Sequence, residues 1–163
     1  MVDMKISERN ELALTSLRLR NGDAAHAHLE EVLGVALPTV PNTVSVHGTT
    51  RICWSAPGEW LLISEAPLDL ARISSACGSF LHHVCDVTHG RTVLELEGRL
   101  VREVIATSCS LDLHDRMFPP NHCATTIFGQ IGAMIVRRDD TFMIVIDASY
   151  ARHLKAWLSK VAN

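Results

Sequence analysis

The chain has 163 residues, 47% of them hydrophobic, and a formal net charge of −3. This length suits a single domain with a sizeable core, and the hydrophobic content excludes wholesale disorder. The near-neutral charge gives no general attraction to nucleic acid or anionic lipid, and the apolar runs are too short to span a bilayer, so neither nucleic acid nor membrane is an expected partner.

The first half of the chain alternates between strand and helix patterns. Closely spaced leucines predict a strand over residues 11–20, with an irregularity at Thr15-Ser16. Residues 24–33 have helical spacing, and Gly34 stands where a helix-terminating glycine belongs. Turn residues then separate three strands, and a proline begins a second helix. The expected strands are 43–46, 51–55 and 60–64, and the expected helix is 67–77.

The second half repeats this order. Residues 91–97 alternate, with Leu94 and Leu96 on one face and Glu95 on the other, which predicts a half-buried strand. Gly98 allows a sharp exit from that strand, because glycine tolerates a positive φ. The other expected elements are strands at 84–87, 122–128, 131–138 and 142–147, and helices at 99–108 and 149–161.

Both halves therefore read strand, helix, three strands, helix. Equivalent elements lie roughly 75 to 80 residues apart, a spacing that indicates duplication of one unit. We expect an α+β fold of two pseudo-duplicated halves, at about residues 11–80 and 81–162. No linker separates the halves, so a single domain over residues 1–163 is expected.

The cysteines and the start of the chain bear on location. The five cysteines are an odd number without a CxxC pair, which favours reduced thiols over a disulfide framework. The opening MVDMKISERN is polar and lacks the apolar core of a secretory signal. Both features predict a cytoplasmic protein.

Metal-ligand side chains gather between His82 and His89. In an extended chain only alternate residues share a face, so one face presents about two ligands, fewer than the four of a closed zinc site. We therefore expect no metal here, and interpret the segment as an edge or loop strand with solvated histidines.

Cysteine catalysis is not expected either. Cys109 lies near His114 but at the carboxyl end of a helix, where the helix dipole disfavours a thiolate. Cys123 follows His122 in an alternating strand and is interpreted as a small core residue.

Two further short patterns favour turns over ligand sites. The sequence GQIG at 129–132 lacks both phosphate-loop spacings and precedes a strand, which predicts a tight turn. The sequence RRDD at 137–140 balances its charges, which predicts a solvated hairpin tip rather than a nucleic-acid patch. The residues alone thus indicate no active site.

Several short motifs nevertheless occur in a recognisable order: PGEWLL at 57–62, DVTHGR at 86–91, CSLDLH at 109–114, FPP at 118–120, ATT at 124–126 and SYARHL at 149–154. The stretch from DVTHGR to the Leu-Asp-Leu corner resembles the folate-binding fold of aminomethyltransferases. The whole set, over about residues 55–158, resembles the gamma subunits of heterotetrameric sarcosine oxidases.

That resemblance implies a role. Such complexes oxidise sarcosine to glycine and hydrogen peroxide, and the methyl carbon passes to tetrahydrofolate. FAD, FMN, NAD and tetrahydrofolate are implied for the complex and none for this chain. The implied partners are the alpha, beta and delta subunits, mainly alpha. Sarcosine is not distinguished from other N-methyl amino acids, because selectivity is implied to reside in another chain.

The resemblance also suggests what this chain lacks. The aminomethyltransferase relatives carry an acidic residue near folate, where Gly132-Ala133 stand here, and neither residue can act as a general base. The expectation is a gamma subunit with no catalytic residue, no metal ligand and no assigned cofactor ligand. His89 and Arg91 are the candidates for an inherited site or contact surface, while Trp54 and Phe118-Pro119-Pro120 are candidates for an exposed partner-binding face. The alternatives are a stand-alone tetrahydrofolate-binding or aminomethyltransferase-like protein, and a scaffold without a metabolic role.

Overall fold

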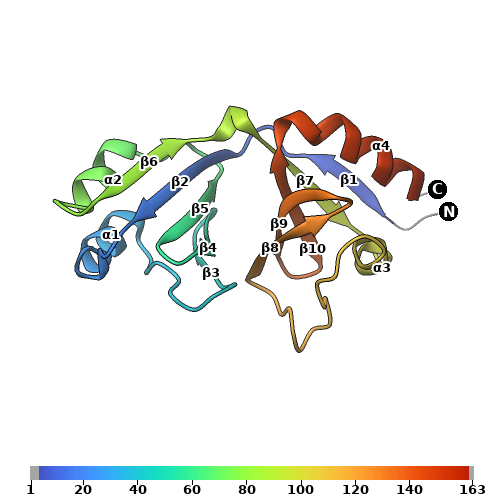
Figure 1. Ribbon diagram of the computed structural model, residues 1–163, viewed down its shortest axis with the longest axis horizontal. Coiled ribbons are helices and arrows are strands. Elements are labelled where there is room, and N and C mark those ends of the chain that lie inside the picture. The colour runs from blue at the N-terminus through green and yellow to red at the C-terminus, as the bar shows by residue number, and fades with distance from the viewer. Residues whose placement is uncertain (1–3, 162–163) are drawn as a thin grey trace. The chain divides into compact units, whose positions relative to one another are not determined.

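The computed structural model describes residues 4–161. These residues form two compact units (Figure 1), one made of residues 11–88 and the other of residues 89–161 together with the N-terminal segment up to Asn10. Each unit contains one five-stranded antiparallel sheet and two α-helices, which confirms the expected α+β class. No helix within residues 4–161 combines the length and the apolar character needed to cross a membrane.

The unit of residues 11–88 has the strand order β3-β4-β5-β2-β6. Its elements are β2 (Ala13–Leu19), α1 (His26–Leu33), β3 (Val44–His47), β4 (Thr50–Ala56), β5 (Glu59–Ser64), α2 (Leu70–Ala76) and β6 (His82–Asp86). A short 3-10 turn, η1 (Asp23–Ala25), precedes α1.

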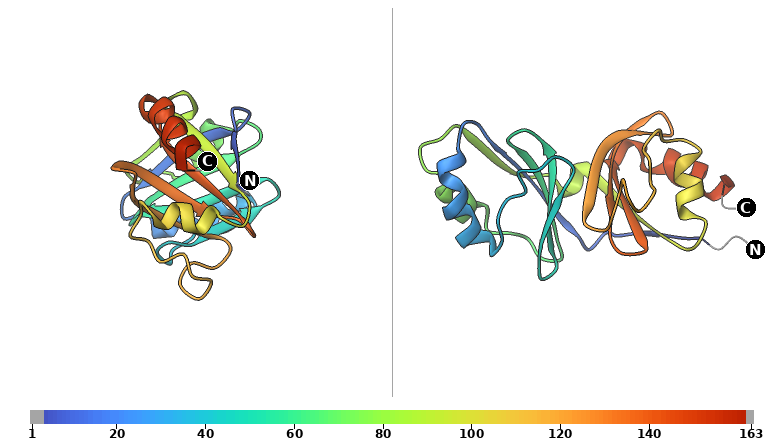
Figure 2. Two further views of the ribbon diagram at one scale, coloured as in Figure 1. Left: turned by 90° about the vertical axis from the view of Figure 1, so that its right-hand side faces the viewer. Right: turned by 90° about the horizontal axis from the view of Figure 1, so that it is seen from below.

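Helices α1 and α2 cover one face of this sheet (Figure 2). Leu29 of α1 and Ile73 of α2 are buried in one cluster with Leu17 and Ile52 of the sheet. Gly34 ends α1 with φ 75°, the left-handed conformation expected of a helix-terminating glycine.

The second unit has the strand order β1-β7-β10-β9-β8. Its elements are β1 (Lys5–Glu8), β7 (Arg91–Glu97), α3 (Val101–Ala106), β8 (His122–Phe128), β9 (Ile131–Arg137), β10 (Thr141–Asp147) and α4 (Ala151–Val161). Its core holds Ile105 of α3 and Leu158 of α4 against Leu94 and Ile144 of the sheet. Turns η2 (Thr88–Gly90) and η3 (Ala148–Tyr150) precede β7 and α4.

Most expected elements are confirmed, but three expectations are wrong. Residues Thr15 and Ser16 pair in continuous register with both neighbouring strands, and the irregularity lies instead between Trp54 and Ala56 of β4. Helix α2 begins at Leu70, because the Asp69 side chain accepts the Arg72 amide and caps the helix there.

The third wrong expectation concerns β7. This strand is internal in its sheet, between β1 and β10, and is buried on both faces over most of its length. Glu95, expected on an exposed face, is only 5% exposed. Strand β1 itself was not predicted, because it is short and carries charged residues.

Candidate functional site

The two candidate residues of the DVTHGR motif lie where the chain enters β7. His89 is exposed in η2, while Arg91 begins β7 and pairs with Asp147 of β10 at 2.9 Å. Arg91 and Asp147 are also opposite each other in the strand register. The positive charge of Arg91 is therefore balanced within its own sheet.

The histidine-rich segment has a structural role on β6. His82 bonds through one ring nitrogen to the Ser74 hydroxyl and through the other to the Phe80 carbonyl, both at 2.7 Å. It therefore links α2 to the edge strand and is partly buried rather than fully solvated as expected, whereas His83 is exposed. Within residues 4–161, no three His, Cys, Asp or Glu side chains are grouped so that they can hold a metal ion.

The cysteines singled out in the sequence lie in the core. Cys123 is fully buried, which confirms it as a small core residue. The Cys109 sulfur accepts the Leu111 amide at 3.4 Å and lies 3.7 Å from the Thr126 hydroxyl.

The strand β9 begins without an acid. Gly129 and Gln130 both have positive φ and form the tight turn that the sequence predicted between β8 and β9. Gly132 is exposed and Ala133 is buried directly after this turn. The start of β9 therefore presents no carboxylate for proton transfer.

The far end of β9 corrects the interpretation of the hairpin arginines as solvated. Arg138 donates to Glu95 of β7 at 2.7 Å, and Arg9 donates to the other oxygen of the same carboxylate. Glu95 is thus a nearly buried anion between two cations. Pairing of this kind is what makes a buried charge tolerable.

Arg137 is also not solvated, being 4% exposed. Its guanidinium donates to the carbonyls of Phe118 and Asp139 and lies 2.7 Å from the Asp115 carboxylate. Arg102 of α3 approaches the same carboxylate at 2.7 Å. Hydrogen bonds from Arg102 and Arg137 lower the pKa of Asp115 below its ordinary value.

Phe118 corrects a further expectation. Its ring is only 2% exposed and belongs to the core of its unit, so it cannot contribute to an exposed partner-binding face. The adjacent Met117 is 66% exposed. The exposed apolar surface at this position therefore comes from Met117 and Pro120 and not from the aromatic ring.

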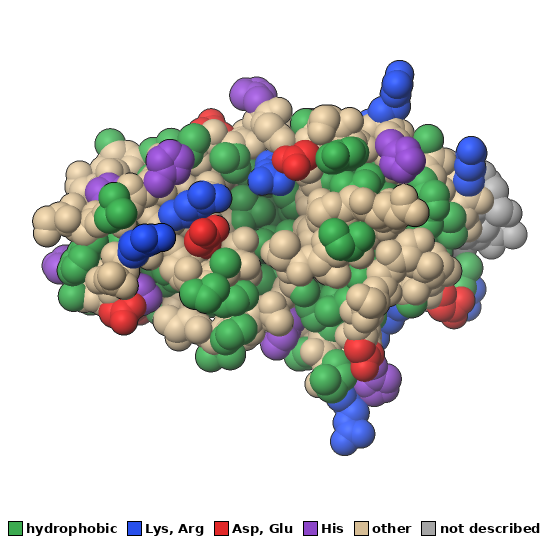
Figure 3. Space-filling model, in the orientation of Figure 1, with side chains coloured by type: hydrophobic (Ala, Val, Ile, Leu, Met, Phe, Trp, Pro, Cys, Tyr) green, Lys and Arg blue, Asp and Glu red, His purple; other side chains and the backbone are tan. Residues whose placement is uncertain are grey.

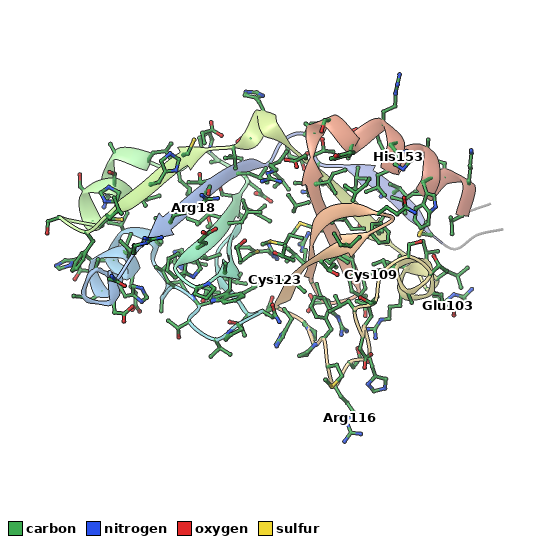
Figure 4. All side chains as sticks on the ribbon, viewed as in Figure 1. Arg18, Glu103, Cys109, Arg116, Cys123 and His153 are labelled. Carbon is green, nitrogen blue, oxygen red and sulfur yellow. The ribbon has the colours of Figure 1, made fainter. Side chains whose placement is uncertain are left out.

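A cavity of about 780 Å³ lies in the unit of residues 11–88. Trp54, Arg20 and the pair formed by Arg18 and Glu59 at 3.4 Å line it. Arg18 and Arg20 are exposed, and Figure 4 shows Arg18 over β2. An indole ring beside cationic groups can hold an apolar or planar group that carries a carboxylate.

One residue that lines this cavity, Trp60, makes two fixed contacts. The Trp60 indole nitrogen donates to the Pro38 carbonyl at 2.8 Å, and the His26 ring meets the Trp60 ring edge-on at 5.7 Å. Both residues line the cavity. The tryptophan therefore holds the 38–41 loop beside the helix that begins at His26.

Sequence reasoning missed these sites because their members are far apart in the chain. Arg9 meets Glu95 of β7, and Arg102 of α3 and Arg137 of β9 meet Asp115 in the loop before β8, so the tertiary packing of these elements had to be known first. One available signal was Glu95 standing between two leucines in the strand, since a buried carboxylate requires cations nearby.

Comparisons with known proteins agree with one another. Residues 20–163 match the model of the family described as "Sarcosine oxidase, gamma subunit family". The sarcosine oxidase subunit gamma of Corynebacterium sp. strain U-96 is 35% identical over 155 residues, which cover 91% of this chain and 75% of that protein. The family match begins at residue 20, well before the first of the sequence motifs described above, which is at residues 57–62.

Solved structures give the same result for the fold. A chain of the heterotetrameric sarcosine oxidase from Corynebacterium sp. U-96, in complex with pyrrole 2-carboxylate, is similar with a TM-score of 0.90 and 30% identity, covering 98% of this chain and 83% of that chain. The glycine cleavage system aminomethyltransferase T from Bartonella henselae has a TM-score of 0.68 at 16% identity, covering 95% of this chain and 45% of that chain, so it shares the fold alone. With the family match over residues 20–163, these findings show that the chain belongs to the sarcosine oxidase gamma subunit family.

Proposed function

We propose that this chain is a non-catalytic subunit of a heterotetrameric sarcosine oxidase that converts sarcosine to glycine and hydrogen peroxide. The observation that carries the proposal is the 35% identity to a gamma subunit over 91% of the chain, together with the TM-score of 0.90 to a chain of a heterotetrameric sarcosine oxidase. The chain stabilises the complex, and the chemistry takes place on other chains.

The contacts of this chain support a non-catalytic role. Gly132 and Ala133 bring no general base to the start of β9, and Arg91 is already paired with Asp147. The other notable charged groups, Glu95 and Asp115, are each held by two arginines. A carboxylate fixed in this way stabilises a fold and is poorly suited to exchanging protons with a substrate.

The same proposal assigns cofactors and partners. FAD, FMN, NAD and tetrahydrofolate bind to the other subunits, and the methyl carbon of sarcosine passes to tetrahydrofolate there. The chain assembles with alpha, beta and delta subunits, mainly with alpha, in the cytoplasm. His89 and Arg91 serve as part of a contact surface, consistent with their exposure.

Co-expression tests this proposal. The tagged chain is produced with the alpha, beta and delta subunits, and the purified material is assayed for sarcosine-dependent hydrogen peroxide formation. We expect all four chains to co-purify, and expect a preparation without this chain to lose stability or yield. A chain that stays strictly monomeric in the presence of all three partners contradicts the proposal.

Tetrahydrofolate titration separates the proposal from its main rival. The aminomethyltransferase-like fold favours the rival reading, a stand-alone folate-binding protein, on grounds of fold alone. Binding of tetrahydrofolate by the isolated chain at micromolar or lower concentration supports that rival. Binding by the complex alone supports a subunit without its own folate site.

We also infer that the chain arose by duplication and acts as one domain. In each sheet three consecutive strands lie next to the strand that precedes the first helix of its unit, as the orders β3-β4-β5-β2 and β8-β9-β10-β7 show. Separate expression of residues 11–88 tests the single-domain proposal. A cooperative, independent unfolding transition of that fragment contradicts it.

A further inference from the structure

We propose that the loop tip, residues 114–117, docks onto another subunit of the complex, with Met117 entering an apolar socket and Arg116 pairing with a carboxylate at its rim. The proposal rests on the subunit role proposed above and names the surface that serves it. The loop concerned, residues 107–121, is the longest stretch of the described chain without a helix or strand. Structureless loops of about this length are uncommon in compact proteins, and those that are well ordered often carry a function.

The two sides of the loop tip are anchored in the core. Leu113, just before the tip, is 6% exposed, and Phe118, just after it, is 2% exposed. Both belong to the core cluster of their unit. Between them the chain turns back on itself, because the amides of Met117 and Phe118 both donate to the His114 carbonyl, at 2.9 and 2.8 Å.

Two arginines, one on α3 and one on β9, hold the conformation of this turn. Arg102 donates to the Leu113 carbonyl at 3.3 Å and Arg137 donates to the Phe118 carbonyl, so each side of the tip has one backbone anchor. Both guanidiniums also meet the Asp115 carboxylate within the tip. Burial of the Arg137 charge is unfavourable without an opposite charge nearby. The ion pair with Asp115 and the bond to the Phe118 carbonyl therefore stabilise both the buried arginine and the conformation of the loop.

The side chains presented by this rigid turn point to solvent. Met117 is 66% exposed, and Arg116 and His114 are also exposed. Figure 4 shows Arg116 extending away from the ribbon, and Figure 3 shows charged, histidine and hydrophobic side chains together on a projection at the same place. Core packing does not require this arrangement, because Leu113 and Phe118 already fill the core on either side.

The chemistry of the tip defines the partner. Asp115 is balanced by Arg102 and Arg137, whereas Arg116 has no ion-pair partner among residues 4–161, so the outward charge of the tip is positive. Methionine adapts to irregular apolar sockets, and both methionine and arginine are enriched in protein interfaces. A turn that is already ordered loses little conformational entropy on binding. The fitting occupant is therefore an apolar socket with an acidic rim on a partner subunit.

Association measurements with tip variants test the inference. The intact chain and its Met117→Asp and Arg116→Glu variants are titrated against the complex of the other subunits. We expect each variant to bind more weakly, on the order of 30-fold for Met117→Asp, which is the effect typical of an interface hot spot. Thermal unfolding of the isolated variants should match the original chain, because both side chains are exposed.

Two controls sharpen the result. Met117→Leu keeps an apolar side chain and should retain binding, and Arg152→Glu makes the same charge change at an exposed site on α4 and should leave binding unchanged. Unchanged binding by both tip variants overturns the inference while the subunit role stands. Equal weakening by Arg116→Glu and Arg152→Glu indicates a general charge effect and also overturns it. Failure of the original chain to bind overturns the subunit role and the inference with it.

Discussion

Arg138, directly after β9, donates to Glu95 of the internal strand β7 at 2.7 Å, and Arg9 of the N-terminal segment donates to the same carboxylate. Replacing Glu95 by Ala leaves two partly buried arginines without their carboxylate partner. We expect the free energy of unfolding of Glu95→Ala to fall by about 2–3 kcal/mol, as measured by urea denaturation.

Glu97 provides a matched control on the same strand. It pairs with Lys5 at 3.5 Å, and both side chains are substantially exposed. Because exposed pairs contribute little, Glu97→Ala should change the free energy of unfolding by about 0–1 kcal/mol. Equal effects of the two substitutions contradict the structural role assigned to Glu95.

The contacts of Asp115 predict an acid-sensitive loop. Arg102 and Arg137 lower the pKa of this carboxyl in the folded chain, so its stabilising effect is fully present above the unfolded value of about 3.9 and is lost as the pH falls toward the lower folded value. Asp115→Asn should therefore speed amide hydrogen exchange in residues 107–121 near neutral pH. The difference from the original chain should shrink below about pH 4.

Asp140→Asn serves as the control for this experiment. Asp140 is exposed at the hairpin tip, and the substitution changes the net charge by the same amount. Hydrogen exchange in the 107–121 loop should be unaffected. A response equal to that of Asp115→Asn points to a global charge effect and contradicts the local contacts.

Gly58 is constrained twice. Its φ is +72°, and a β-carbon would meet the Leu19 carbonyl oxygen at 2.5 Å. Gly48 has a similar φ of +57° but open space around it, and Gly90 has neither constraint. The melting temperature should fall most for Gly58→Ala, less for Gly48→Ala at a cost of about 1–2 kcal/mol, and least for Gly90→Ala. A different ranking of the three melting temperatures contradicts the conclusion that Gly58 is constrained both by its φ and by the nearby Leu19 carbonyl.

The thiols should react in an order set by burial. Cys85 is partly exposed, whereas Cys53, Cys77 and Cys123 are fully buried. Burial raises the pKa of the Cys77 thiol, whose hydrogen is also donated to the Ile73 carbonyl at 3.4 Å. Iodoacetamide at neutral pH should label Cys85 first, with mass spectrometry locating the adduct, and the other three should react only on unfolding. Early labelling of Cys77 contradicts its burial.

The sequence predicted most accurately the strands whose ends are marked by residues close to them in the chain. The bounds of β7 and β8 agree with the sequence, because alternation and flanking glycines mark them. Helix ends were less accurate, as the start of α2 shows, because a side-chain cap such as Asp69 competes with the proline signal. A side-chain cap depends on the local backbone geometry, which the spacing of apolar residues does not reveal.

The candidate contacts were harder to predict for a different reason. Phe118 and Met117 are adjacent and both apolar, yet one is buried and the other exposed, since the turn after His114 decides their directions. Arg137 and Arg138 are likewise opposite in direction, toward Asp115 and Glu95. The neighbouring Asp139 and Asp140 led to the prediction that both arginines are solvated. That prediction was wrong because the acids that pair with them come from distant segments.

The pairing of β1 with β7 affects how the protein forms on the ribosome. Residues 11–88 emerge as one uninterrupted segment, whereas β1 must wait for β7, which is made much later. At a synthesis rate of about 5–20 residues per second, this delay is on the order of ten seconds. Lys5 and Glu8 at the ends of β1 discourage its pairing with other nascent chains during that time. The charged residues that made β1 hard to predict from the sequence therefore also disfavour its pairing with other chains until β7 is synthesised.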